Sequence, residues 1–178
     1  MLVLVVGPSG AGKDTLLRGA RAALAGDARF VFPRRTITRP ADAEAEDHDT
    51  LSVDAFRDAA AAGAFALTWE AHGLHYGLPS AIADDIQAGR VVVINGSRAA
   101  LASALARFPD SRVVLVDATP AERARRLAAR GRESAAEIAA RIARETPQVP
   151  EGAVIVDNSG APVAGIAALI AVLNDFIR

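Results

Sequence analysis

Apolar runs of strand length alternate along the chain with segments of helical spacing. Residues 2–6 and 91–94 are unbroken apolar runs, which is typical of strands buried on both faces of a parallel sheet. Strands are predicted at 2–6, 29–32, 65–70, 91–94, 112–116 and 153–156, and helices at 14–24, 53–62, 79–89, 98–107, 164–177 and after Thr119 and Ser134. This alternation predicts one α/β domain over 1–178, built on a doubly wound, parallel five-stranded sheet.

A glycine-rich segment follows the first predicted strand and has the spacing G-x-x-x-x-G-K of a phosphate-binding loop. Glycines let such a loop curl, so that its N–H groups and the N-terminus of the next helix face an anion. Lys13 would bring a mobile charge to the outer phosphates. We therefore expect a P-loop NTPase fold whose ATP site is formed by Gly7, Pro8, Ser9, Gly10, Ala11, Gly12, Lys13, Asp14 and Thr15.

The position after the lysine departs from the usual pattern. A Ser or Thr hydroxyl there would bind Mg²⁺, but this chain has Asp14, with Thr15 one place later. Either Asp14 ligates Mg²⁺, or it caps the helix and Thr15 reaches the metal. The alternative to a phosphate site is an accidental match in an ordinary turn. The order of strand, loop and helix argues against that, as does the fact that Lys13 is the only lysine among 20 basic residues.

Composition limits the other function classes. The chain has 178 residues, no cysteine and a formal net charge of −1, which argues against thiolate metal sites and broad nucleic-acid binding. No apolar run approaches the length of a membrane span, and Met1 leads directly into a strand without a basic leader. We therefore expect a cytoplasmic protein that binds neither membranes nor nucleic acid. The oligomeric state stays open, with a homodimer as one option.

Two further segments carry candidate chemistry. Residues 33–40 combine three arginines with two threonines, which suits an anion site, although a solvated loop is equally consistent with the pattern. Residues 41–50 read as an acidic loop, and 71–77 as a turn whose two histidines are a weak metal signal. The helices after Thr119 and Ser134 meet at Gly131 and are rich in arginine, which suits a lid over phosphates or two amphipathic surface helices. We expect residues 34–79 to form a substrate-binding insertion in the α/β domain and residues 123–145 to form the lid region.

Four sets of residues together resemble the guanylate kinase family over nearly the whole chain: the glycine-rich loop, Thr36–Pro40, Trp69–Gly73 with Tyr76-Gly77, and the arginine-rich lid. Some features are similar to a subgroup of that family that acts on a sugar bisphosphate: Gly-Lys-Asp in the loop, Arg35-x-x-Thr38-Arg39-Pro40-Ala41-Asp42, Glu46-Asp47-His48 and Asn95-Gly96-Ser97-Arg98. The chain departs from the guanylate kinase pattern in three places. His48 stands where that pattern has a tyrosine, and the second arginine that the pattern has shortly after Arg39 is missing. The acids that end the family's equivalent of strand 91–94 are replaced by Asn95, Ser97 and Arg98. Guanine favours carboxylate acceptors, whereas an extra phosphate favours cations.

The resemblance implies an ATP- and Mg²⁺-dependent transfer to the 1-phosphate of ribose 1,5-bisphosphate, which yields 5-phosphoribosyl 1-diphosphate (PRPP) during phosphonate breakdown. Lys13 would be catalytic, together with the lid residues Arg130, Arg132 and Arg141. The small sugar phosphate would be bound by a set drawn from Arg35, Thr38, Arg39, Glu70, His72, Tyr76, Asn95, Ser97 and Arg98. The alternatives are a guanylate or other nucleoside monophosphate kinase, a non-catalytic kinase-like binding module and, less favoured by the charge balance, a nucleic-acid-directed ATPase.

Overall fold

The computed structural model describes residues 1–39, 48–71, 73–131, 133–144 and 151–177, and only the backbone of Arg98. The chain forms two compact units. The first consists of Met1–Leu4 and Ala25–Arg112, and the second of Val5–Leu24 and Val113–Arg178.

A five-stranded sheet has the strand order β2-β7-β1-β8-β9. Its strands are β1 (Leu2–Val6), β2 (Phe30–Val31), β7 (Val91–Asn95), β8 (Arg112–Asp117) and β9 (Val154–Asp157). β2 pairs with β7, and β8 with β9, in parallel. All of β1 and the apolar residues of β7 and β8 are buried, as expected for strands covered on both faces. The predicted five-stranded α/β sheet is therefore confirmed.

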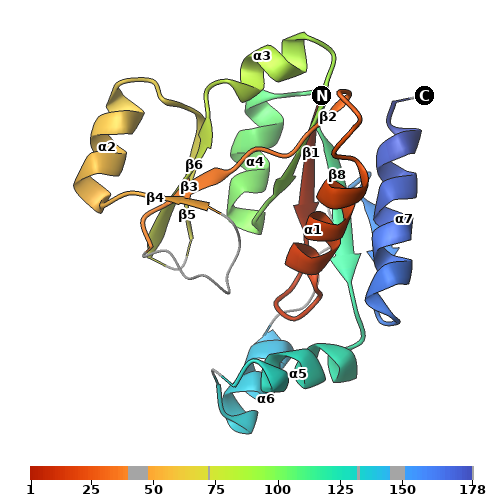
Figure 1. Cartoon of the computed structure of the whole chain (residues 1–178). Coiled ribbons are helices and arrows are strands. Elements are labelled where there is room, and N and C mark those ends of the chain that lie inside the picture. The colour runs from red at the N-terminus through yellow and green to blue at the C-terminus, as the bar shows by residue number, and fades with distance from the viewer. Residues whose placement is uncertain (40–47, 72, 132, 145–150, 178) are drawn as a thin grey trace. The chain divides into compact units, whose positions relative to one another are not determined.

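The first unit also contains a four-stranded sheet of order β4-β3-β6-β5. Its strands are β3 (Arg35–Ile37), β4 (His48–Thr50), β5 (Phe65–Ala71) and β6 (Leu74–Pro79), and its helices are α2 (Val53–Ala61), α3 (Ile82–Gln87) and α4 (Arg98–Arg107). The Ser52 hydroxyl caps α2 by accepting from the N–H of Ala55 at 3.2 Å. The Phe56 ring of α2 stacks on Phe65 and His75, so this helix covers one face of the β5–β6 hairpin (Figure 1).

Three expectations for this unit are corrected. Residues 35–37 and 48–50 are short strands rather than loop, although their sequences lack alternation. The two segments pair with each other, and residues 35–37 also pair with β6. The expected turn 71–77 is mostly strand, since Gly73, at φ 71°, lets Leu74 onward pair back on β5. Pro79 ends β6, so α3 begins only at Ile82. The acidic segment 40–47 lies outside the described residues.

The second unit carries four helices in its described part: α1 (Lys13–Ala23), α5 (Pro120–Ala129), α6 (Ala135–Arg144) and α7 (Pro162–Asp175). α1 and α7 lie side by side (Figure 1), and a Cβ at Gly19 would clash with Ile166. The helices predicted after Thr119 and Ser134 both begin with a capping hydrogen bond. The Thr119 hydroxyl accepts from the N–H of Glu122 at 3.3 Å. Ser134 and Glu137 form a reciprocal capping box at α6.

Among the helices of the described ranges, none combines the length and apolar character needed to cross a bilayer.

Candidate nucleotide and acceptor sites

The phosphate-binding loop connects β1 to α1, as the sequence predicts. Gly10 and Gly12 have left-handed φ angles of 81° and 91°. A Cβ at Gly10 would press on the backbone of Arg123, and one at Gly12 would clash with the side-chain amide of Asn158. Only glycine combines this backbone with such close neighbours, so the loop stays open to an incoming anion.

Lys13 bends back over the loop that precedes it. Its Nζ donates to the carbonyl oxygens of Gly7 at 2.7 Å and Pro8 at 3.2 Å. This places the ammonium at the mouth of the loop, where it can exchange a carbonyl for a phosphate oxygen. The geometry suits the compact charge of lysine better than a planar guanidinium.

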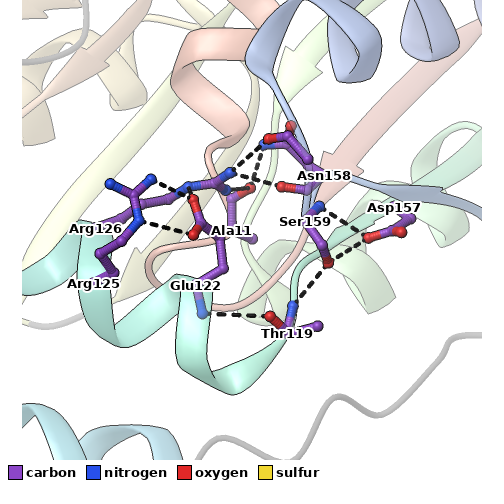
Figure 2. A network of polar contacts seen from close by, with 9 residues as sticks. Ala11, Thr119, Glu122, Arg125, Arg126, Asp157, Asn158 and Ser159 are labelled. Carbon is purple, nitrogen blue, oxygen red and sulfur yellow. Dashed lines mark hydrogen bonds and ion pairs between the residues drawn. The ribbon is translucent and has the colours of Figure 1, made fainter.

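Side chains from distant parts of the chain hold the loop's carbonyls. Arg123, whose exposed fraction is 2%, donates from Nε to the Ser9 carbonyl at 2.9 Å. The Ala11 carbonyl accepts from Asn158 Nδ2 at 2.7 Å and from Arg126 Nη1 at 3.2 Å (Figure 2). The sequence motif does not include these residues, and only the arginine-rich character of α5 hinted at them.

Charge also shapes α5. Glu122 pairs with Arg125 and Arg126 at 2.7 Å each. The side-chain hydrogen bond from Arg125, followed by the charges of both arginines, lowers the pKa of Glu122 from 4.5 to about 2. Glu122 is therefore ionised at neutral pH and orients Arg126 toward the loop.

The two candidate metal-binding residues lie in the first turn of α1. The Asp14 and Thr15 side chains are both exposed. Within the described ranges, no three histidine or acidic side chains gather into a cluster able to hold a metal ion.

The expected lid residues are distributed over α5 and α6. Arg130 ends α5 and is exposed. Arg141, in α6, forms an ion pair with Glu133 at 2.8 Å, so both partners lie within the expected lid segment 123–145. Arg132 lies outside the described residues.

In the first unit, Arg35 is the centre of the candidate acceptor site. It is 7% exposed and donates from Nη1 to the Asn95 carbonyl at 2.5 Å. Its guanidinium lies 5.8 Å from the Trp69 ring centroid and 5.4 Å from that of Tyr76. The two rings are stacked, with centroids 5.2 Å apart. These contacts fix a buried cation against an aromatic wall.

Strand register decides which residues share this wall. Tyr76 is opposite both Ile37 and Trp69, and Arg35 is opposite His48, so these side chains lie on one face. Glu70 is adjacent to Trp69 in β5 and therefore projects from the opposite face, together with His75, which packs against α2. The structure thus brings Arg35 and Tyr76 together but does not place Glu70 beside them.

The other candidates are differently placed. Thr38 uses its hydroxyl to accept from the N–H of His75 at 2.9 Å, which ties β3 to β6. Arg39 Nε and the Ser97 hydroxyl are buried and have no hydrogen-bond partner among the described residues, so both could receive a ligand oxygen. Ser97 precedes α4, but its hydroxyl forms no cap. His72 and the side chain of Arg98 lie outside the described part of the chain.

The chain is similar to known proteins over nearly its whole length. The family profile described as an AAA domain matches residues 3–145. Ribose 1,5-bisphosphate phosphokinase PhnN of Acidiphilium cryptum is 55% identical, over 94% of this chain and 90% of that protein. The protein of the same name from Methylobacterium radiotolerans is 51% identical over 97% of both chains. This chain belongs to the ribose 1,5-bisphosphate phosphokinase family.

Two other similarities bear on this family's architecture. A solved guanylate kinase from Anaplasma phagocytophilum has a TM-score of 0.71, covers 100% of this chain and is 14% identical, so it supports the P-loop kinase fold. A bifunctional ribose 1,5-bisphosphokinase-thymidine phosphorylase of Azorhizobium caulinodans is 50% identical over 97% of this chain, which spans only 25% of that longer protein. A phosphokinase of this family can therefore occur alone or as part of a larger polypeptide.

Proposed function

We propose that this protein transfers the γ-phosphoryl group of ATP to the 1-phosphate of ribose 1,5-bisphosphate during phosphonate breakdown. An oxygen of the 1-phosphate forms a bond to the γ-phosphorus, and the bond from that phosphorus to the bridging oxygen of ADP breaks. ADP and 5-phosphoribosyl 1-diphosphate are the products. The proposal is carried by the match to relatives named ribose 1,5-bisphosphate phosphokinase over nearly the whole chain.

The acceptor in this reaction is a phosphate oxygen that is largely ionised near neutral pH, so no strong general base is required. The barrier comes mainly from bringing two anions together in line. The protein therefore catalyses the reaction mainly by positioning the two phosphate groups and neutralising their charge. The loop's N–H groups would hold the phosphates of ATP, and Lys13 would exchange its contact with Gly7 for the γ-phosphoryl group.

When bound, Mg²⁺ would neutralise part of the charge of the phosphates. Asp14 and Thr15 are the residues proposed to hold it, directly or through water. Asp14→Ser separates their roles, and the titration of activity against Mg²⁺ is the measurement. A raised Mg²⁺ requirement assigns the metal to Asp14, and an unchanged requirement leaves Asp14 as a residue of the helix start with Thr15 as the metal-binding group.

The lid arginines would close over the transferring group. Arg130 caps the end of α5, and Arg141 would leave Glu133 to reach a phosphate. Arg132, outside the described residues, stays a candidate for the same role. Substituting Arg130 by alanine is expected to lower kcat by about 10³-fold or more, as for other arginines that stabilise phosphoryl transfer. The dissociation constant for ADP should change little, because this interaction belongs to the transition state.

In the first unit, we propose that the wall formed by Arg35, Trp69 and Tyr76 receives a phosphate of the sugar. Arg39 and Arg98 would supply further positive charge, and the unpaired Ser97 hydroxyl and the Asn95 side chain would contact oxygens of the same ligand. Glu70 projects from the other face, so it is not part of this set. His72 remains a candidate for a ribose hydroxyl.

Phosphorus NMR tests the assignment directly. Purified protein is incubated with Mg²⁺-ATP and either ribose 1,5-bisphosphate or GMP. A new diphosphate signal with the sugar, and none with GMP, is expected. GDP formation without sugar turnover would make this a guanylate kinase, and tight binding of both ligands without ADP formation would make it a non-catalytic binding module.

We expect the reaction to run in the cytoplasm, because ATP is available there, and we propose a homodimer as the working assembly. Light scattering on the purified protein measures the mass. A mass near the 18.4 kDa of one chain would exclude the dimer.

A further inference from the structure

Helix α5 touches the phosphate-binding loop at two alternating carbonyls. Arg123 and Arg126 are three residues apart, so they share one helix face. Arg123 Nε donates to the carbonyl of Ser9 at 2.9 Å, and Arg126 Nη1 donates to that of Ala11 at 3.2 Å. Asn158, in the turn after β9, adds a second donor to the Ala11 carbonyl at 2.7 Å.

Holding a carbonyl also sets the direction of an amide. The carbonyl of Ala11 and the N–H of Gly12 belong to one peptide plane, and in a trans peptide they point in opposite directions. The described residues contain no cis peptide bond. A carbonyl held by Arg126 and Asn158 on one side of the loop therefore turns the Gly12 N–H to the other side, where an anion can accept from it. Rotation of this plane would present an oxygen to the phosphates and repel them.

We propose that Arg126 and Asn158 are positioning residues that aim the Gly12 N–H at the phosphates of the nucleotide by holding the Ala11 carbonyl from behind. The inference rests on the proposed function only in requiring that the loop bind a nucleotide. The identity of the sugar acceptor does not enter into it.

The contacts of both residues support an indirect role. Asn158 is 2% exposed and therefore inaccessible to a nucleotide. Arg126 has each nitrogen engaged: Nε with Glu122, Nη1 with Ala11, and Nη2 with the Asn158 carbonyl at 2.7 Å. Figure 2 shows the side chains of Arg126 and Asn158 meeting at the Ala11 carbonyl. These bonds fix the orientation of the Arg126 side chain, so that it acts on the loop and not on the nucleotide itself.

The neighbouring residue Arg125 provides a matched control. It pairs with the same carboxylate, Glu122, but its side chain is 71% exposed, compared with 16% for Arg126. Among the described residues, its nitrogens donate to Glu122 and not to the loop. Arg125→Gln and Arg126→Gln remove the same charge from adjacent positions of one helix. Their difference isolates the contact with the loop.

The experiment titrates full-length protein with Mg²⁺-ADP by calorimetry and follows the Gly12 amide by ¹H–¹⁵N NMR. Arg126→Gln and Asn158→Ala should each weaken ADP binding by about 10–100-fold, since each removes a hydrogen bond that orients the loop. In these variants the Gly12 amide chemical shift should differ from that of the unaltered protein before ADP is added. It should also change less when ADP is added. Arg125→Gln should bind within about twofold of the unaltered protein. If Arg126→Gln fails to fold, Arg126→Lys is used, which retains a single donor.

The double variant Arg126→Gln/Asn158→Ala completes a double-mutant cycle for ADP binding. Because both residues act on one carbonyl, their effects on ADP affinity should be less than additive. Folded variants with unchanged ADP affinity and unchanged Gly12 response would overturn the proposal, as would strict additivity. Failure of sugar turnover in the unaltered protein, with ADP binding intact, would instead refute the proposed acceptor and leave this inference standing.

Discussion

Lys13 is the residue whose removal should affect catalysis most directly. Lys13→Ala is expected to lower kcat/KM by about 10²–10³-fold, because one preorganised donor to the transferring phosphoryl group is lost. Lys13→Arg should also be impaired, since its larger planar head does not fit the contact made with Gly7 and Pro8. Steady-state kinetics measures both variants.

Arg18→Ala, on an exposed position of the same helix, is the control for charge removal. It should retain nearly full activity. Equal losses in Arg18→Ala and Lys13→Ala would mean that net charge matters at this helix and that a specific phosphate contact does not.

Gly165 is the residue where a normally favourable substitution should be harmful. Replacing a helical glycine by alanine usually stabilises a helix by about 0.5–1 kcal/mol. Here a Cβ would clash with Asn158 Oδ1 and come within 3.3 Å of Leu16. Gly165→Ala should therefore lower the free energy of unfolding by about 1–3 kcal/mol. Urea denaturation measures the change, with Gly26→Ala as a control because nothing lies within 4 Å of that position.

Individual residues also mark how far sequence reasoning extends. Lys13 could be assigned because the loop motif is local and its spacing is specific. Arg126 and Asn158 could not, because they bind Ala11 from 115 and 147 residues away. Asn158 gives no signal of its own in a turn, where an asparagine usually serves local backbone geometry. Only the folded chain reveals that it contacts the loop.

At the scale of elements, α5 is expected to show a defined pH response. Its Glu122 has a pKa of about 2 instead of 4.5, so the ionised carboxylate stabilises the fold. That contribution is complete above pH 4.5 and disappears as pH falls toward 2. The difference in Tm between the unaltered protein and Glu122→Gln should therefore be largest above pH 5 and shrink between pH 4.5 and 2.

Thermal unfolding across this pH range checks the prediction. Asp27, whose pKa is also about 2 because of its bond to Arg29, titrates in the same window in the first unit. Asp27→Asn should therefore show a similar trend and serves as a positive control. A difference between Glu122→Gln and the unaltered protein that stays constant from pH 6 to pH 2 would contradict the low pKa.

Elements with strong local signals were predicted well, and paired short strands were not. Ser52, Thr119 and Ser134 each precede a predicted helix, and the hydroxyl of each accepts a capping hydrogen bond from a backbone N–H three residues later. β3 and β4 contain only three residues each, and their polar sequence resembles a loop. Their strand character comes from pairing, of β4 with β3 and of β3 with β6, which is a tertiary effect that periodicity cannot express. The same pairing decided which candidate acceptor residues share a face.

At the scale of the whole molecule, the nucleotide product ADP and the sugar substrate should each stabilise the protein when they bind. A ligand at about 100 times its dissociation constant adds about 2.7 kcal/mol, which corresponds to a rise in Tm of roughly 5–10 °C for a chain of this size. ADP with Mg²⁺ and ribose 1,5-bisphosphate should each produce such a shift, whereas GMP should produce little. Lys13→Ala should reduce the shift with ADP and leave the shift with the sugar largely intact, because Lys13 and Arg35 belong to different units of the chain. Differential scanning fluorimetry with the three ligands measures this, and a large shift with GMP alone would reverse the assignment of the acceptor.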